Sequence, residues 1–304
     1  MTPLGMTAVL AVDTRSLIGH YALVRRRDAV HACRSTGGDA MGALEIVDQR
    51  YRLVYDRAME VLGNDRRVLS ATLTGSVADG TADPWSDLDL VVITHPEDHD
   101  EFVASWPEWL AAITPTVFAR TPIAPFIINA VTADGLTVDF AIFSGVQPAF
   151  PPPSTQYTVG FLPIRFDSIG EALEYAVVEQ LRGLAGPFLS LVLRDEHIRY
   201  LTGVPHLMGL LTTVFLAETG ELPPGKHWNR TFTSEQQAAV ASLPALRATR
   251  ADVIAWGLAL AELIVSRARP LYPRYSLVWP EDFAVVAAAR VEQNFGVNIS
   301  GWLY

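Results

Sequence analysis

A proline-rich stretch divides the chain into two parts whose apolar patterns differ. Pro148 and Pro151 to Pro153 predict a stiff linker, because proline holds its own backbone angle nearly constant. Before the linker, apolar runs typical of strands alternate with segments of helical period, whereas the helical period dominates after it. The pattern therefore predicts an α+β fold, in which a mixed β-sheet flanked by helices is followed by an all-α helical bundle.

The individual elements follow from the same periodicity. Before the linker, helices are predicted over 43–63 and 102–113 and strands over 68–74, 88–94, 126–131 and 136–143, the last two as a hairpin. After the linker, helices are predicted over 170–185, 187–200, 205–218, 234–242, 247–268 and 280–294.

The first 40 residues differ in composition from the rest. They contain five arginines and three acidic residues and end in Gly37-Gly38, just before Met41. We expect a poorly ordered extension, with Met41 as an alternative start, because untethered termini are often disordered. A docked helix over 17–30 is the alternative. The predicted organisation is an extension over 1–40, a first domain over 41–150 and a helical domain over 151–304.

Negative charge is concentrated in the first predicted domain. Of the 304 residues 23 are basic and 33 acidic, and residues 41–160 alone hold 16 acidic residues against six arginines. A net charge of -10 disfavours nucleic acid as the main partner. The same field attracts divalent cations and positively charged small molecules. The single cysteine, Cys33, excludes a disulfide framework within the chain.

The sequence does not predict a membrane span. No run reaches about 18 consecutive apolar residues, and the most apolar segment, 253–265, carries Glu262. The N-terminus does not read as an export leader. We therefore expect a cytoplasmic protein without a membrane partner, and the oligomeric state stays open.

Two aspartates flank the first residue of a predicted strand. Asp87 and Asp89 open the apolar run Leu88 to Ile93, so both side chains are expected on one face, about 6.6 Å apart along the strand. Burying two carboxylates together is costly unless a cation offsets their charge, and paired oxygen ligands suit Mg²⁺. The second pair of this spacing, Asp98 and Asp100, follows a proline among polar residues and predicts only a turn or helix start.

A third carboxylate is predicted at the same place. Asp139 interrupts the apolar run 136–143, where an aspartate is unusual for a strand. If this strand lies beside 88–94, the three carboxylates can hold two metal ions about 3.5–4 Å apart, the arrangement used for phosphoryl or nucleotidyl transfer.

Gly75-Ser76 supplies groups for a phosphate. The pair follows the predicted strand 68–74, and ten residues separate it from Asp87. Glycine allows close backbone approach to a phosphate, and the serine hydroxyl can donate a hydrogen bond to it.

This combination resembles the signature of the DNA polymerase beta nucleotidyltransferase superfamily. Its minimal-core branch includes the aminoglycoside and lincosamide nucleotidyltransferases, in which a helical domain follows the catalytic one. The resemblance covers 43–143 by motif and the remainder only by layout. It implies that Asp87 and Asp89 bind metal, that Asp139 binds metal or acts as a base, and that Gly75 and Ser76 hold a triphosphate.

The only lysine, Lys226, lies in the predicted break between two helices. A lysine is a natural point charge for phosphate. Members of the superfamily carry a triphosphate-binding Lys or Arg on the helical domain, and Lys226 resembles that element. Trp228 is expected in the core rather than against a nucleotide. Glu179 is expected at the surface, with a role as general base as the alternative.

The sequence therefore predicts an Mg²⁺-dependent enzyme that moves AMP from ATP to a hydroxyl of a small molecule and releases pyrophosphate. The acidic first domain suits a polycationic antibiotic of the aminoglycoside type, which would make the enzyme a resistance factor. Two alternatives remain: transfer to a protein side chain, as in toxin-type nucleotidyltransferases, and a non-catalytic nucleotide sensor.

Overall fold

The computed structural model describes residues 47–121, 127–145, 166–220 and 228–303. The predicted extension, the proline-rich linker and Lys226 lie outside these residues. The predicted domain limits near 40 and 150 therefore stay predictions.

Five strands form one mixed sheet in the order β1-β2-β5-β4-β3. Their bounds are β1 Val68–Thr74, β2 Leu88–Thr94, β3 Thr116–Arg120, β4 Ile127–Thr132 and β5 Thr137–Ser144. The central strands β2 and β5 run parallel, and every other neighbouring pair is antiparallel. The mixed sheet was predicted, and β3 is an addition to the predicted strands.

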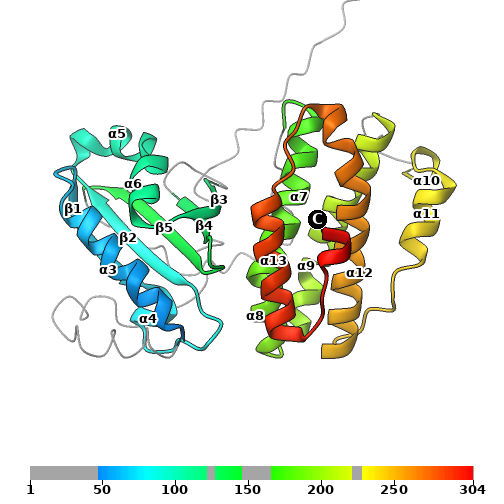
Figure 1. The fold of residues 1–304 in the computed structure, drawn as a ribbon, viewed down its shortest axis with the longest axis horizontal. Helices are drawn as coiled ribbons and strands as arrows, with labels where there is room; N and C mark the ends of the chain where they lie inside the picture. The colour runs from blue at the N-terminus through cyan, green and yellow to red at the C-terminus, as the bar shows by residue number, and fades with distance from the viewer. Residues whose placement is uncertain (1–46, 122–126, 146–165, 221–227, 304) are drawn as a thin grey trace, which may run out of the picture.

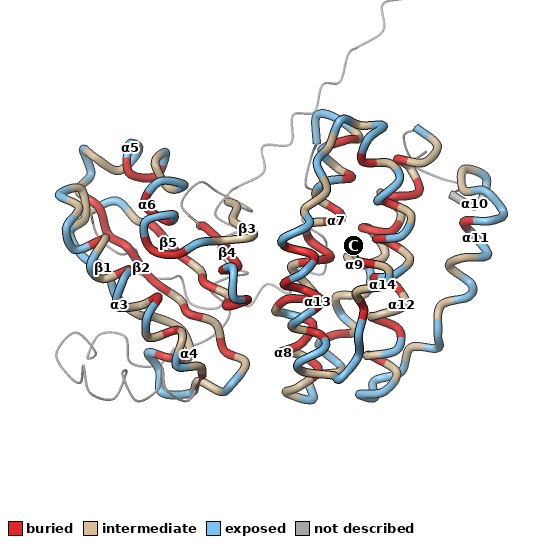
Figure 2. The backbone as a smooth tube through the Cα atoms, viewed as in Figure 1, coloured by how far each residue is buried: buried red, intermediate tan, exposed pale blue. Residues whose placement is uncertain are grey.

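Helices cover one face of this sheet. They are α3 Gln49–Gly63, α5 His99–Ala104 and α6 Trp106–Ile113, with the short helices α4 Gly75–Ala78 and η2 Pro96–Asp98 at strand ends. Leu88, Leu90 and Val92 alternate along β2 and join residues of α3 and α6 in one hydrophobic core. The residues between them, Asp89 included, must face the other side. Figure 2 shows that β2 is buried over most of its length.

The rest of the described chain is helical. Its elements are α7 Ile169–Ala185, α8 Pro187–Leu193, α9 His197–Thr219, α10 Trp228–Thr231, α11 Ser234–Ala241, α12 Arg250–Ala268, η3 Arg269–Leu271, η4 Pro273–Tyr275, α13 Glu281–Phe295 and α14 Ser300–Leu303. They enclose a second hydrophobic core, which confirms the predicted all-α part. In Figure 1, α7, α8 and α13 lie on the side toward the sheet, and α10 and α11 lie on the far side.

Four predicted helices differ from the observed ones by more than a few residues. The helix predicted over 43–63 begins at Gln49, after the N-cap Asp48. The helix predicted over 187–200 ends at Leu193, because the chain turns at Asp195, whose φ is 55°. The next helix begins at His197 and not at Pro205, which lies inside it. The helix predicted over 102–113 is divided at Ser105 into α5 and α6.

Strand β3 joins the two cores. Phe118 of β3 stacks on Phe283 of α13 with ring centroids 5.0 Å apart. Phe118 and Val131 of β4 thereby belong to the core of the helical part, although both lie in the sheet. The face of α13 is in this way held against the edge of the sheet, with β4 between β3 and the strand that carries Asp139.

Two segments of the described residues, Ile169–Leu193 and His197–Thr219, are long and apolar enough to cross a membrane by length and composition alone. Of their 18-residue windows, 56% and 33% are buried inside the protein. Core helices of soluble proteins pass the same test, so the finding is weak evidence for a span. The predicted cytoplasmic location and the absence of a membrane partner stay predictions.

Candidate active site

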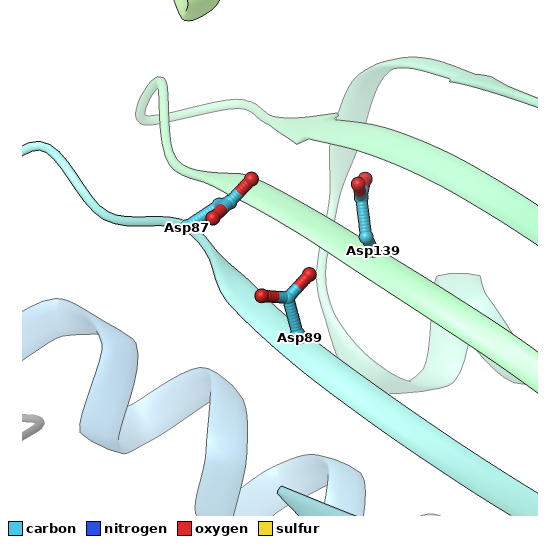
Figure 3. A group of neighbouring side chains, drawn as sticks. All are labelled: Asp87, Asp89 and Asp139. Atoms are coloured by element: carbon cyan, nitrogen blue, oxygen red, sulfur yellow. The ribbon is translucent and has the colours of Figure 1, made fainter. Parts of the chain in front are cut away.

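Three carboxylates converge at the beginning of the two central strands. Asp89 of β2 and Asp139 of β5 are register partners in the parallel pair, so both side chains point to the same face. Asp87 lies immediately before β2. One oxygen from each of the three side chains lies within 4.8 Å of the others. Figure 3 shows the three groups pointing toward a common space, which confirms the predicted juxtaposition.

Gly75 is packed directly against one of these carboxylates. It begins α4 with a φ of +66°, a conformation that side-chain-bearing residues rarely adopt. A Cβ atom at this position would lie 2.9 Å from Cγ of Asp89 and closer still to its Oδ2. The close backbone approach predicted at Gly75 is observed against the carboxylate of Asp89. The predicted contact of Gly75 with a triphosphate stays a prediction.

Asn129 orients the third carboxylate. It lies on β4 opposite Asp139, and its Nδ2 donates a 2.8 Å hydrogen bond to Oδ1 of Asp139. Asn129 is 4% exposed, so the residues packed around it restrict the orientation of its amide group. The sequence offered no signal for Asn129, because only the pairing of β4 with β5 brings it to the site.

Burial and mutual repulsion keep protons on these groups. Burial, followed by the charges of Asp87 and Asp139, raises the pKa of Asp89 to about 8. Burial, followed by the charge of Asp87, raises the pKa of Asp139 to about 7. The pKa of Asp87 is also raised, again mainly by burial. Ionising all three carboxylates at neutral pH is therefore unfavourable in the absence of a compensating cation.

The donor set fits divalent metal. Hard cations such as Mg²⁺ take oxygen ligands, and three carboxylate oxygens within a few ångströms provide them. A cation there would remove the repulsion that raises the three pKa values. Asp87, Asp89 and Asp139 are thus the residues that would hold Mg²⁺.

A cavity of about 260 Å³ separates the carboxylates from the helical part. Asp87 and Asp139 line it from the sheet. Four arginines line it from the helical part, and no sequence pattern marks any of them: Arg182, Arg194, Arg199 and Arg290. Guanidinium groups bind phosphate oxygens through paired hydrogen bonds. Negative and positive side chains therefore face each other across a space open to a charged ligand.

Arg290 of α13 differs from the other three arginines, each of which forms an ion pair. Its Nε donates to the carbonyl oxygen of Ala185 at 3.3 Å, and among the described residues it forms no ion pair. Burial lowers its pKa, since a desolvated guanidinium is unfavourable. An anion bound in the cavity would offset that cost.

Arg194 holds the loop that precedes Asp87. Its Nε and Nη2 donate to the two oxygens of Asp83 at 2.7 and 2.8 Å. The same carboxylate accepts from the backbone N–H of Trp85 at 3.0 Å and from the hydroxyl of Ser86 at 3.1 Å. This pair fixes the turn one residue before Asp87 and links the helical part to the sheet.

Glu179 is not at the surface, contrary to expectation. It is 7% exposed and accepts hydrogen bonds from Arg120 of β3 and from Arg182, whose Nε lies 2.9 Å from Oε1. Both of its oxygens are occupied by guanidinium groups, so it is poorly placed to take a proton from a substrate. The amphipathic pattern of the helix could not show that β3 would supply Arg120.

Among the other residues considered from the sequence, Ser76, Asp98 and Asp100 lie in the described part of the chain. Ser76 is the second residue of α4, and its carbonyl oxygen accepts from the N–H of Thr81 at 2.9 Å. It is not among the residues that line the 260 Å³ cavity. Asp98 and Asp100 lie at η2 and the start of α5, as expected for a helix start.

Residues 57–150 match the family model of the nucleotidyltransferase domain. No curated protein matches the chain. The matched segment contains all five strands and the three converging carboxylates. The chain thus carries a nucleotidyltransferase domain, which makes it a nucleotidyltransferase enzyme. The aminoglycoside and lincosamide branch stays a prediction.

Proposed function

We propose that this enzyme moves AMP from ATP to a hydroxyl group of a small molecule and releases pyrophosphate. The observation that carries the proposal is the cavity with Asp87 and Asp139 on one wall and the arginines on the other. A nucleoside triphosphate has anionic phosphates for the arginines and binds divalent metal, which the carboxylates attract.

Asp87, Asp89 and Asp139 hold Mg²⁺ in this proposal, with two ions as the expected number. When bound, Mg²⁺ supplies charge neutralisation of the triphosphate and lowers the pKa of the acceptor hydroxyl. Asn129 keeps Asp139 oriented, and the Asp83–Arg194 pair holds the approach to Asp87.

The phosphates are held by the arginines and, as the sequence predicts, by Gly75, Ser76 and Lys226. Arg290 and Arg199 face the cavity from two different helices, so they can contact different phosphates. Lys226 lies outside the described residues, and its part in the proposal rests on the sequence alone.

The reaction exchanges one phosphorus–oxygen bond for another. The acceptor oxygen attacks the α-phosphorus, the bond from that phosphorus to the bridging oxygen breaks, and pyrophosphate leaves with the bond electrons. One of the three carboxylates takes the hydroxyl proton.

A pyrophosphate-release assay tests the proposal. The purified enzyme is incubated with ATP and Mg²⁺ against a panel of aminoglycosides, lincosamides, neutral alcohols and cell extract. We expect release that depends on both acceptor and metal, and loss of at least about 100-fold in Asp89→Asn. Asp100→Asn, from the second Asp-x-Asp pair, is the matched control and should behave like the wild type.

The outcomes separate the rival functions. A mass increase of about 330 Da on a protein in the extract would place the acceptor among proteins. ATP binding without release across the whole panel would favour a sensor. Wild-type turnover by Asp89→Asn would refute the metal assignment.

A further inference from the structure

A second cavity, of about 150 Å³, adjoins the catalytic one within the helical part. It lies among α7, α8, α9 and α12. The two cavities share four wall residues: Arg182, Pro187, Leu191 and Arg199. Because Arg182 also acts electrostatically on Asp139, the second cavity begins close to the reacting groups.

The wall of the second cavity is mostly apolar and firmly packed. Phe188 and Tyr200 are buried and tilt against each other with ring centroids 5.7 Å apart. Gly257 of α12 lies against both: a Cβ atom there would lie 2.6 Å from the Phe188 ring and 2.9 Å from the Tyr200 hydroxyl. The two rings thus pack against the backbone of α12 at Gly257, where a side chain would have no room.

Two glycines leave the space free. Gly183 of α7 and Gly203 of α9 both line the cavity, and a Cβ atom on either would meet no atom within 4 Å. Glycine within a helix costs about 1 kcal/mol relative to alanine. Neither position needs glycine for backbone conformation, since neither has a positive φ. A ligand in the space beside these two glycines would explain why neither position carries a side chain.

The charged groups around the cavity leave no place for a cation. The carboxylate of Glu179 is held by Arg120 and Arg182. Arg199 also lines the cavity, and its partner Glu196, at 3.1 Å, is not among the lining residues. Burial, followed by the nearby charges of Arg182 and Arg120, lowers the pKa of His206, so its imidazole is neutral at pH 7. An ammonium group would meet arginines without a free carboxylate to pair with.

One polar group in the wall lacks a partner. Gln180 is 5% exposed, and its side-chain oxygen has no hydrogen-bond partner among the described residues. Such an acceptor is unfavourable when buried alone, and a ligand N–H or O–H would satisfy it.

The volume sets the size of the occupant. An apolar cavity of about 150 Å³ in another protein accommodates a benzene molecule. We propose that the second cavity binds an uncharged apolar group of the acceptor, of about the size of a phenyl ring, while the acceptor hydroxyl reaches into the catalytic cavity. That this group belongs to the acceptor rests on the proposed function. The cavity and its preference for an uncharged apolar group do not depend on that function. A polycation without an apolar group fails this fit.

Binding of benzyl alcohol tests the proposal with the full chain. Affinity is measured by ligand-observed NMR and calorimetry for the wild type, Gly203→Leu and Gly209→Leu, with glucose and spermidine as comparison probes. Gly203→Leu fills the cavity, whereas Gly209 lies exposed in the same helix, also with nothing within 4 Å of a Cβ. We expect benzyl alcohol to bind at least about tenfold more weakly to Gly203→Leu and equally to Gly209→Leu.

Three results would overturn the proposal: no binding of benzyl alcohol to the wild type, equal binding to Gly203→Leu, or equally tight binding of spermidine at this cavity. If Gly203→Leu is poorly folded by circular dichroism, Gly183→Leu fills the same space from α7. Pyrophosphate release is measured in parallel. Benzyl alcohol binding without release under any condition would defeat the proposed function alone, and release unaffected by filling the cavity would defeat its role in acceptor binding alone.

Discussion

Gly75 lies so close to Asp89 that a Cβ atom would reach within 2.9 Å of the Cγ of the carboxylate. The start of α4 and the carboxylate of Asp89 are therefore packed directly against each other. We predict that Gly75→Ala displaces Asp89 and lowers kcat/KM by about 100-fold, as misplacement by about 1 Å can do. Gly80→Ala is the matched control: Gly80 also has a φ of +66° but no atom within 4 Å. It should cost about 1–2 kcal/mol of stability through backbone strain and leave activity intact. Equal losses in both variants would contradict the packing argument.

Mg²⁺ affinity should rise with pH. The pKa values of about 8 for Asp89 and about 7 for Asp139 mean that both groups are largely protonated at pH 6 and largely ionised at pH 9. Metal binding needs the ionised forms and therefore releases protons at pH 7. Calorimetry in two buffers of different ionisation enthalpy measures this release. Affinity that is constant between pH 6 and 9 would contradict the raised pKa values.

The metal-free enzyme should become less stable as the pH rises from about 4 to about 8. In this window the folded state binds more protons than the unfolded state, because folding raises the carboxylate pKa values from 3.8. Asp89→Asn removes one of the buried charges and should stabilise the metal-free protein by about 1–2 kcal/mol at pH 8. At pH 4 the variant and the wild type should be nearly equal. Urea denaturation with EDTA at both pH values is the measurement.

Breaking the Asp83–Arg194 pair should impair catalysis through the position of Asp87. Asp83→Asn keeps the shape of the side chain but loses the charge that Arg194 contacts at 2.7 Å. We expect kcat to fall about tenfold, with lower Mg²⁺ affinity. Asp56→Asn breaks the exposed Arg52–Asp56 pair and should change stability by less than about 0.5 kcal/mol with full activity. A double-mutant cycle with Arg194→Gln should show that the two effects at Asp83 and Arg194 are not additive.

Replacing Arg290 should affect nucleotide binding more than turnover of bound nucleotide. Arg290→Gln removes a buried cation from the cavity wall, and we expect KM for ATP to rise about tenfold. Steady-state kinetics at varied ATP is the measurement, and Arg247→Gln, at an exposed ion pair, is the control. A variant with unchanged KM would show that the phosphates bind elsewhere.

The sequence predicted the elements whose signal is local. Strands 68–74 and 88–94 have the predicted bounds, because their apolar runs are closed by glycine or proline. Strand β3 was missed, since five residues after Pro115 carry too short a pattern. Pro205 predicts a helix start, but packing of α9 against its neighbours outweighs the single hydrogen bond that proline removes.

The site residues also fall into those with a local sequence signal and those placed only by tertiary contacts. The spacing of Gly75, Asp87 and Asp89 is visible in one short segment, and the out-of-place Asp139 marks the strand beside it. The four arginines of the cavity cannot be recognised among the 22 arginines of the sequence. Arg182 and Arg290 come to the same cavity only through the packing of α7 and α13. Asn129 and the buried state of Glu179 likewise depend on pairings between distant segments.

The separation of the two hydrophobic cores bears on how such enzymes diversify. The aspartates are anchored in one core, whereas the second cavity is carved into the other. The sheet residues Phe118 and Val131 belong to the bundle core, but neither lies on the two strands that hold Asp89 and Asp139. Substitutions around the second cavity can therefore alter the proposed acceptor pocket, while the pairing of β2 with β5 keeps both aspartates in place.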